Sequence, residues 1–379
     1  MWVSQIQLEN YRNYSQQSVA LKPGITMIHG ENGEGKTNLV EALVFLANLQ
    51  SHRVAGYQPL IARESNTSQL SAVVNHEGRS LNLAAELNRS SSNRYFVNSN
   101  QQKRANDLLG HLKAVIFAPE DLDLVRRDPQ DRRTFLDSAI VLLKPRMAGV
   151  FSDYDRVIKQ RNALLKSARG IKNPDMTTLD IWDDQLVQFG AEIIYARLNL
   201  VSDIEPLLRN FYRELSLSDE EINLEIRSSI VAGSDEEDLK TLRGLSHLEI
   251  KDLFLETLHG KRANELERGV CLVGPHRDEL LISKNDLVAK SHSSQGEAWS
   301  LALGLKLALA ELIRADSFTG DPVLILDDVY SVLDSGRRAR LTSFVSKNEQ
   351  VLITTADKSV TPDLEWAAQL EIQGGVVLG

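Results

Sequence analysis

The sequence predicts an α/β protein in which two sheet-forming halves flank a long helical insertion. One observation is a glycine-rich turn at residues 30–35, placed between an apolar strand and an amphipathic helix. Another is the short apolar strand at 323–326, which is followed by two aspartates. In addition, helical hydrophobic periods replace strand signals from about Arg132 onward. Together they predict a mixed sheet with flanking helices, interrupted by a domain of different architecture.

The N-terminal third is rich in strand signals. Apolar and polar side chains alternate from residue 2, as they do in a half-buried strand, and a Pro23-Gly24 turn precedes an apolar run. We expect an antiparallel β subdomain beside the main sheet. The expected elements are strands at 2–8, 25–29, 92–100 and 113–122, a helix at 38–49, and a hairpin at 70–87 with its turn at 76–78.

The middle of the chain predicts helices that run out and return over 140–265, and the last third returns to strands. This pattern predicts three parts with the boundaries 1–138, 139–267 and 268–379. Further expected elements are a loop at 170–180, an exposed acidic loop at 233–238, strands at 269–282, 323–326 and 351–357, a helix at 295–313 and a closing strand segment.

Bulk composition excludes several classes of protein. The chain has 379 residues, a net charge of −9 and one cysteine, Cys271, so it has neither an internal disulfide nor a cysteine-based zinc site. No run approaches the ~20 apolar residues of a membrane helix, and the N-terminus lacks a signal-peptide apolar region. We therefore expect a cytoplasmic protein. The negative net charge argues against indiscriminate nucleic-acid binding but allows a local basic groove.

The glycine-rich turn fits the Walker A pattern, with four residues between Gly30 and Gly35 and with Lys36-Thr37 following. Glycines allow backbone N–H groups to surround a phosphate at a helix N-terminus. Lys36 is expected to reach the β- and γ-phosphates and Thr37 to ligate Mg²⁺; the alternative is a chance glycine turn. The predicted ATP-binding residues are Gly30, Glu31, Asn32, Gly33, Glu34, Gly35, Lys36, Thr37 and Asn38.

The strand VLIL followed by Asp327 and Asp328 looks like Walker B. Asp327 is expected to hold Mg²⁺ through its water shell, and Asp328 to act as the general base that polarises the attacking water. A solvated aspartate pair at a strand end is the alternative. The predicted catalytic residues are Asp328 and Lys36, and the predicted metal residues are Thr37 and Asp327.

A third segment, SSQGE, begins the predicted helix at 295–313. Ser294 and Glu297 have capping-box spacing, and a plain helix cap would explain them. Combined with the long insertion between Lys36 and Asp327, however, the segment matches the plan of ATP-binding-cassette proteins, in which this cap resembles the signature motif. The residues Ser294, Gln295, Gly296 and Glu297 would then close over ATP bound by a second subunit, so that ATP drives dimerisation.

Nearly the whole chain resembles the RecF family of bacterial recombination mediators, which is related to SMC-type ATPases. The matching segments are LENYRNY (8–14), the P-loop with TNLVEAL, SHR (51–53), FAPEDLDLV (117–125), RRTFLD (132–137), LVGPHRDEL (272–280), SQGE (294–297) and LDDVYSVLD (326–334). The resemblance implies an ABC/SMC-like ATPase head and a weak DNA-dependent ATPase that uses ATP and Mg²⁺. It also implies an ATP-dependent homodimer at gaps and single-strand/double-strand junctions. With RecR and RecO, that dimer would promote RecA loading in fork maintenance, repair and SOS induction.

Three positions depart from the cassette pattern. Aspartate, not glutamate, occupies position 328, which agrees with slow hydrolysis, and Val332 stands where the D-loop usually has an acidic residue. No switch histidine follows the strand at 351–357, so Thr355 or Asp357 is the expected γ-phosphate sensor. His276 and Arg277 belong to a family-like segment, but the sequence assigns them no role.

Basic residues supply the DNA-contact candidates, because Lys and Arg bind phosphates through charge. The principal candidates are Arg126, Arg127, Arg132 and Arg133, and solvated helix faces are the alternative for each. Few aromatic residues accompany them, so backbone contact to duplex is favoured over base stacking. Further candidates are Lys144, Arg146, Arg156, Lys159, Arg161, Arg337, Arg338 and Arg340.

Three other functions are weaker alternatives. An SMC-type DNA-organising head would need longer arms than ~125 residues can form at ~1.5 Å per residue. A nucleotide-binding subunit of a transporter usually has a much shorter insertion. A phosphotransferase would need an acceptor pocket near the P-loop, for which the sequence offers no candidate.

Overall fold

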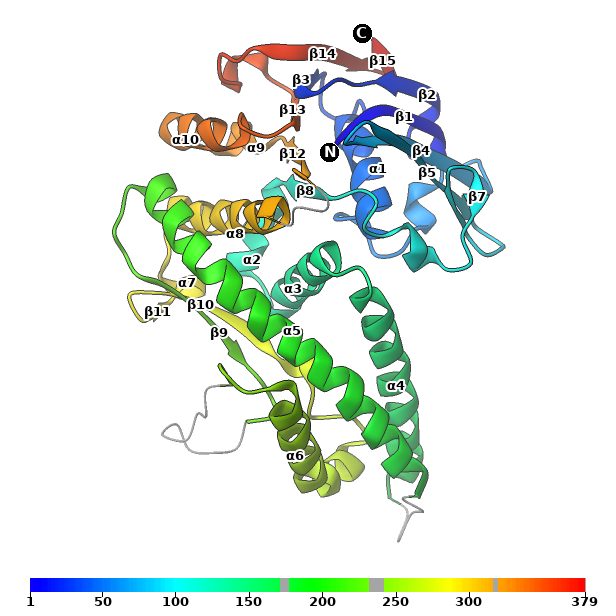
Figure 1. Cartoon of the computed structure of the whole chain (residues 1–379), viewed down its shortest axis with the longest axis vertical. Coiled ribbons are helices and arrows are strands. Elements are labelled where there is room, and N and C mark those ends of the chain that lie inside the picture. The colour runs from blue at the N-terminus through cyan, green and yellow to red at the C-terminus, as the bar shows by residue number, and fades with distance from the viewer. Residues whose placement is uncertain (171–176, 232–241, 316–319, 379) are drawn as a thin grey trace.

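A computed structural model describes residues 1–170, 177–231, 242–315 and 320–378. Figure 1 shows a β-rich head, which contains both termini, and an arm of long helices that extends away from it. Two of the expected loops, 233–238 and most of 170–180, lie outside the described residues. Among the helices that are described, none combines enough length and apolar character to cross a membrane.

The head contains an antiparallel sheet, sheet A, in the strand order β2-β1-β4-β5-β6-β7. Its strands are β1 (Trp2–Tyr11), β2 (Tyr14–Ala20), β4 (Thr67–His76), β5 (Arg79–Asn88), β6 (Arg94–Val97) and β7 (Asn100–Gln101). The predicted hairpin is confirmed, with its turn between β4 and β5. The sequence analysis missed β2, because this edge strand is mostly polar and lacks a clear alternation.

The second sheet of the head, sheet B, has the order β15-β14-β3-β13-β12-β8. Its strands are β3 (Gly24–His29), β8 (Ala114–Phe117), β12 (Val323–Asp327), β13 (Gln350–Thr355), β14 (Trp366–Gln373) and β15 (Val376–Leu378). The strands β14, β3, β13, β12 and β8 are parallel. Their carboxyl ends therefore meet at one edge of the sheet, where ligands bind in open α/β folds.

Sheet B separates two hydrophobic cores, which explains why its strands are apolar on both faces. Along β12, Val323 and Ile325 point into a core shared with sheet A and α1 (Lys36–Asn48). Leu324 and Leu326 point into a second core that continues into the arm. The helices α8 (Gln295–Ala315) and α5 (Thr177–Ser216) pack against each other in this second core (Figure 1).

The arm consists of helices and a small sheet. Its main helices are α3 (Pro129–Leu143), α4 (Met147–Ala168), α5 and α6 (His247–Arg268), and its sheet has the order β11-β10-β9, with β9 (Ile222–Arg227), β10 (Glu279–Lys284) and β11 (Leu287–Val288). Helices dominate the insertion as expected, but β9 was not anticipated. It pairs with β10, which the sequence analysis had assigned to the last part of the chain, so the arm draws on residues beyond 267.

The expected strand at 269–282 is correct only from Glu279. Gly274 has a φ of 130° and Pro275 lacks an N–H group, so the chain forms the turn η5 (Pro275–Arg277) instead of a ladder. The remaining short elements are η1 (Gln58–Leu60), η2 (Ala105–Leu108), η3 (Pro119–Leu122), α2 (Asp123–Arg126), α7 (Ala289–His292), α9 (Val329–Val332), α10 (Ser335–Val345) and η6 (Lys358–Val360).

Candidate functional site

The glycine loop lies between β3 and α1, at the carboxyl edge of sheet B. Gly33 and Gly35 have φ values of 91° and 117°, in the region that favours glycine. A Cβ atom at Gly30 would lie 2.3 Å from the carbonyl oxygen of Ile372 on β14, and one at Gly35 would lie 2.6 Å from Asn13 Nδ2. Larger residues are therefore excluded by both conformation and space. The loop forms the backbone cradle expected of a P-loop.

Lys36, the first residue of α1, points back into this loop. Its Nζ donates hydrogen bonds to the carbonyl oxygens of Gly30 and Glu31, both at 2.8 Å, and the residue is 6% exposed. Burial lowers the pKa of Lys36, while the nearby carboxylates of Asp328 and Asp327 oppose that shift. The ammonium group thus lies inside the loop, where an oxyanion could bind it.

Asp327, the last residue of β12, is joined to α1 and β13 by hydroxyl groups. Its Oδ1 accepts hydrogen bonds from Thr37 Oγ1 at 3.0 Å and from Thr354 Oγ1 at 2.5 Å. Burial raises the pKa of Asp327, which is 4% exposed, and the two hydroxyl donors oppose that shift. A carboxylate beside a hydroxyl suits Mg²⁺, which usually binds one or two carboxylates together with substrate phosphates. The described residues contain no cluster that could hold a metal by protein ligands alone.

Asp328 has a left-handed backbone conformation, with a φ of 53°. This conformation is unfavourable for a residue with a side chain and tends to occur at functional sites. Its N–H donates to Thr354 Oγ1 at 3.0 Å, so one threonine holds both aspartates. The site therefore fixes the backbone of the proposed general base.

The expected γ-phosphate sensors were Thr355, the last residue of β13, and Asp357, which follows the strand. Thr355 donates its hydroxyl to the carbonyl of Asp357, and the Asp357 carboxylate accepts the N–H of Ser359. Both side chains are thus engaged in the local turn. The residue that faces Walker B is Thr354, one position earlier, and strand alternation could have identified it once the register with β12 was known.

A shell of polar residues surrounds the P-loop from outside. Asn13 donates to the carbonyl of Glu34 at 2.9 Å and accepts from Asn38, which in turn accepts from Arg53. Arg12 donates twice to the buried carboxylate of Glu41 on α1. Asn13 and Arg12 belong to the family-like segment LENYRNY and Arg53 to SHR, and no local pattern in the sequence predicts their contacts with the P-loop and α1.

An open pocket of about 650 Å³ adjoins this shell. Four arginines contribute to its wall, and no carboxylate does: Arg12, Arg53, Arg63 and Arg89. The pocket shares Asn13 and Asn38 with the P-loop shell. An anion held by the loop would therefore lie near the arginines of the pocket wall.

The capping box predicted at the start of α8 is present. The backbone N–H of Ser294 donates to the Glu297 carboxylate at 2.7 Å, and the Glu297 N–H donates to Ser294 Oγ at 3.3 Å. Lys284 on β10 holds the same carboxylate at 2.7 Å. Ser294 and Gln295 are exposed, and within the described part of the chain no hydrogen bond or ion pair joins residues 294–297 to residues 30–38.

Arg337 connects the helix that begins at this cap with the loop after Walker B. Its guanidinium pairs with Asp334, the N-cap of α10, and donates to Ser300 on α8 at 3.0 Å. A Cβ atom added to Gly296 would lie 2.8 Å from Arg337 Nη2, so a larger residue would require the guanidinium to move. Arg337 was a DNA candidate, but its charge is used within the protein. In the same loop, Val332 is an exposed apolar residue.

The principal DNA candidates differ in exposure. Arg126 and Arg127 are exposed, and Arg127 pairs with Asp123. Arg132 was a wrong choice: it is 3% exposed and donates to Glu279 at 2.6 Å and to the carbonyls of Leu124 and Arg127. The charge of Arg132 is therefore paired with that of Glu279, and this ion pair joins α3 to β10.

Arg161 was also a wrong choice. It is 0% exposed and binds Asp183 on α5 and Glu265 on α6, both at 2.6 Å. Arg133 is half-buried and donates to the carbonyl of Asp278 and to the side chain of Gln130. The two neighbouring arginines at 132 and 133 therefore have different surroundings.

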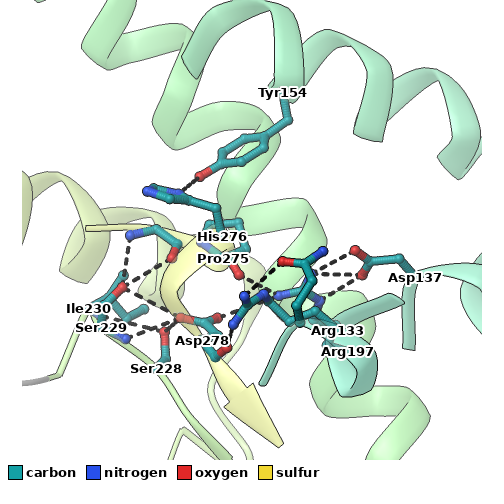
Figure 2. A network of polar contacts seen from close by, with 12 residues as sticks. Arg133, Asp137, Tyr154, Arg197, Ser228, Ser229, Ile230, Pro275, His276 and Asp278 are labelled. Atoms are coloured by element: carbon teal, nitrogen blue, oxygen red, sulfur yellow. Dashed lines mark hydrogen bonds and ion pairs between the residues drawn. The ribbon is translucent and has the colours of Figure 1, made fainter. Parts of the chain in front are cut away.

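The segment LVGPHRDEL joins α3, α4 and α5 of the arm through a polar network, which Figure 2 shows. Tyr154 OH lies 2.7 Å from His276 Nδ1, and Arg197 donates to the carbonyl of Pro275 and twice to Asp137. Burial raises the pKa of Asp278 to about 6 and lowers that of His276 to about 4. His276 is thus neutral at pH 7, and the hydrogen bonds of the network hold η5 against α4 and α5.

Comparisons with known proteins agree with this geometry. The model of the RecF/RecN/SMC N-terminal domain matches residues 2–375. The protein "DNA replication and repair protein RecF" of Clavibacter sepedonicus is 46% identical over 100% of this chain and 95% of its own length. The protein of the same name from Streptomyces avermitilis is 41% identical, over 100% and 99%.

Solved structures give the same result. One described as "the recombination mediator protein RecF-ATP in RecFOR pathway" is 28% identical, with a TM-score of 0.86 over 99% of this chain and 98% of that chain. An Smc head bound to the C-terminal winged-helix domain of ScpA is 14% identical, with a TM-score of 0.53 over 100% and 97%, and is similar in fold alone. The predicted ABC/SMC-like head with an inserted arm is confirmed.

Proposed function

Because the chain belongs to the RecF/RecN/SMC N-terminal domain family and is a DNA replication and repair protein of the RecF type, we propose that it is an ATP-dependent DNA-binding recombination mediator. Two copies dimerise on DNA at gaps and single-strand/double-strand junctions when ATP is bound. Together with RecR, and indirectly with RecO, the dimer promotes RecA loading during replication fork maintenance, repair and SOS induction.

The residues of the P-loop supply the ATP-binding half of the site. Backbone N–H groups of 30–38 and the Lys36 ammonium hold the phosphates, and Thr37 and Asp327 hold Mg²⁺, as their 3.0 Å contact allows. Mg²⁺ supplies charge neutralisation at the phosphates when it is bound. Asp328 accepts a proton from the attacking water. Because aspartate is shorter than the glutamate that many cassette ATPases have at this position, Asp328 agrees with a slow, DNA-dependent ATPase.

The second half of each site comes from the partner subunit. Ser294, Gln295, Gly296 and Glu297 begin α8, and a helix N-terminus attracts anions. The observation that carries this proposal is the exposed, preformed cap, which makes no bond to its own P-loop among the described residues. An anion site that faces solvent on one protomer can be completed by the phosphates on another.

An SMC-type DNA-organising head is the alternative. Its long coiled-coil arms distinguish the two functions, and the helices here are short: α4 has 22 residues and α5 has 40, or roughly 33 and 60 Å at the helical rise. An arm of this size favours a compact mediator.

Sedimentation velocity of Asp328→Asn with ATP and a labelled gapped duplex tests the proposal. We expect a monomer-to-dimer shift that carries the DNA, and Lys36→Met should abolish it. Ser294→Arg should bind ATP as a monomer but fail to dimerise, whereas Ser167→Arg, at an exposed serine of α4, should dimerise normally. Loss of ATP binding in Ser294→Arg would place Ser294 in its own site and refute the shared-site model.

A further inference from the structure

A cleft of about 890 Å³ lies where the head meets the arm. The helix α3 contributes one part of its lining, and α4, the end of α1 and residues 105–109 contribute others. The polar network of Figure 2 adds Arg197, Pro275 and His276 to the lining. Because α1 begins in the P-loop and ends at this cleft, one rigid helix of 13 residues joins the two sites.

The lining of this cleft is positively charged, although the protein as a whole is negative. Its four cationic side chains are Arg133, Arg156, Lys159 and Arg197, and its two anionic side chains are Asp137 and Asp155. Asp137 is neutralised by Arg197, which donates to both carboxylate oxygens at 2.8 Å. Within the described ranges, the ion pair of Arg156 is with the partly exposed Asp153, a contact of the kind that contributes little to stability and is easily exchanged.

The neutral part of the lining is also suited to phosphates and sugars. It contains amide and hydroxyl side chains, which make much of the backbone contact in protein–DNA complexes. The amide residues are Asn48, Gln50, Asn106, Gln130 and Gln160, and the hydroxyl residues include Thr134, Ser138 and Ser152. Small-molecule sites are, by contrast, lined mainly by apolar side chains.

We propose that this cleft, the α3 cleft, binds the sugar-phosphate backbone of one DNA strand, an inference that rests on the proposed function. Arg156 and Lys159 stand three positions apart on α4, so their Cβ atoms are about 5–6 Å apart and can serve successive phosphates. Both side chains are exposed and lie outside the buried network, and the Arg156–Asp153 pair is at the surface. An acidic polypeptide would use the same cationic side chains, so polyglutamate serves as the competing probe.

Charge-removal variants on α4 test the inference. We expect Arg156→Gln/Lys159→Gln to bind DNA roughly tenfold more weakly in 0.1 M salt, and to lower the slope of log K against log salt by about 1.8 for a duplex and about 1.4 for a single strand. The matched control is Lys166→Gln, at an exposed lysine of the same helix outside the lining, which should bind as the wild type does. Fluorescence anisotropy with ATP, on labelled duplex and single-stranded oligonucleotides, measures both quantities and identifies which form supplies the strand.

A gain-of-affinity variant excludes misfolding as the explanation. Asp155→Asn removes a repulsive carboxylate from the cleft, so it should bind DNA several-fold more tightly and show a larger salt slope. Unchanged affinity and slope in both cleft variants, with a wild type that binds DNA, would overturn the α3 cleft alone. A wild type that binds no DNA with ATP would refute the proposed function and this inference together. If Arg156→Gln/Lys159→Gln lost the ability to bind polyglutamate but bound DNA as the wild type does, the cleft would be assigned to an acidic polypeptide instead.

Discussion

The buried cluster around Arg161 makes a quantitative prediction about the arm. Arg161 on α4 lies between Asp183 on α5 and Glu265 on α6, and all three are at most 1% exposed. Asp183 keeps a second partner, Arg262, whereas Glu265 would keep the backbone N–H of Leu272, at 2.7 Å, but no cation among the described residues. Arg161→Met preserves most of the apolar volume while leaving a buried carboxylate without a cation. Removing one partner of a buried pair costs about 3–5 kcal/mol.

Urea unfolding followed by circular dichroism measures this loss. With an m-value of about 3 kcal/mol/M, the midpoint should fall by roughly 1 M or more. The matched control is Arg156→Met on the same helix, whose exposed pair with Asp153 should contribute less than about 1 kcal/mol. Adding Glu265→Gln to Arg161→Met should recover part of the stability, because the orphaned charge is removed. Equal, small losses in the buried and exposed variants would refute the reasoning.

Three further predictions concern the site and its surroundings. Arg337→Met should weaken ATP-dependent dimerisation several-fold in sedimentation velocity, because α8 loses its hydrogen bond to Arg337 of α10. The affinity of the monomer for ATP should be unchanged. A parallel loss of ATP affinity would contradict this role. Cys271 is buried and burial raises its pKa to about 12, so iodoacetamide at pH 8 should label it only after unfolding, and rapid labelling of the native protein would count against the fold. Burial lowers the pKa of His276 to about 4, so its stabilising contribution is complete above pH ~6.5 and is lost as the pH falls toward 4. The free energy of unfolding of His276→Gln should therefore fall less steeply than the wild type's over that window, and identical slopes would exclude His276 as the titrating group.

Local patterns were enough to predict most elements of the head. The strand-glycine-helix order around Lys36, the apolar strand before Asp327 and the Ser294–Glu297 capping box all appear where the sequence analysis expected them. These features depend on neighbours within a few residues, where conformational preference and hydrogen-bond reach are determined by the chain itself. The roles assigned to these residues remain predictions.

Errors arose where partners are distant in the sequence. Nothing near Arg132 or Arg161 distinguishes them from surface arginines, because their burial depends on Glu279 and on Asp183 and Glu265 in other elements. Similarly, β9 became recognisable only through its pairing with β10.

By itself, the sequence determined the class of the protein: a P-loop with its helix, an acidic strand end and a helix cap, since each is a short segment with its own stereochemistry. Only the tertiary structure decided which side chains share a site. The register of β13 on β12 places Thr354, not Thr355, against Asp327, and the fold brings Arg337 into contact with Ser300 on α8. It also gathered the charges of α3, α4 and α5 into one cleft. The physical reason is that charge and hydrogen bonding act over a few ångströms in space, whatever the separation along the chain.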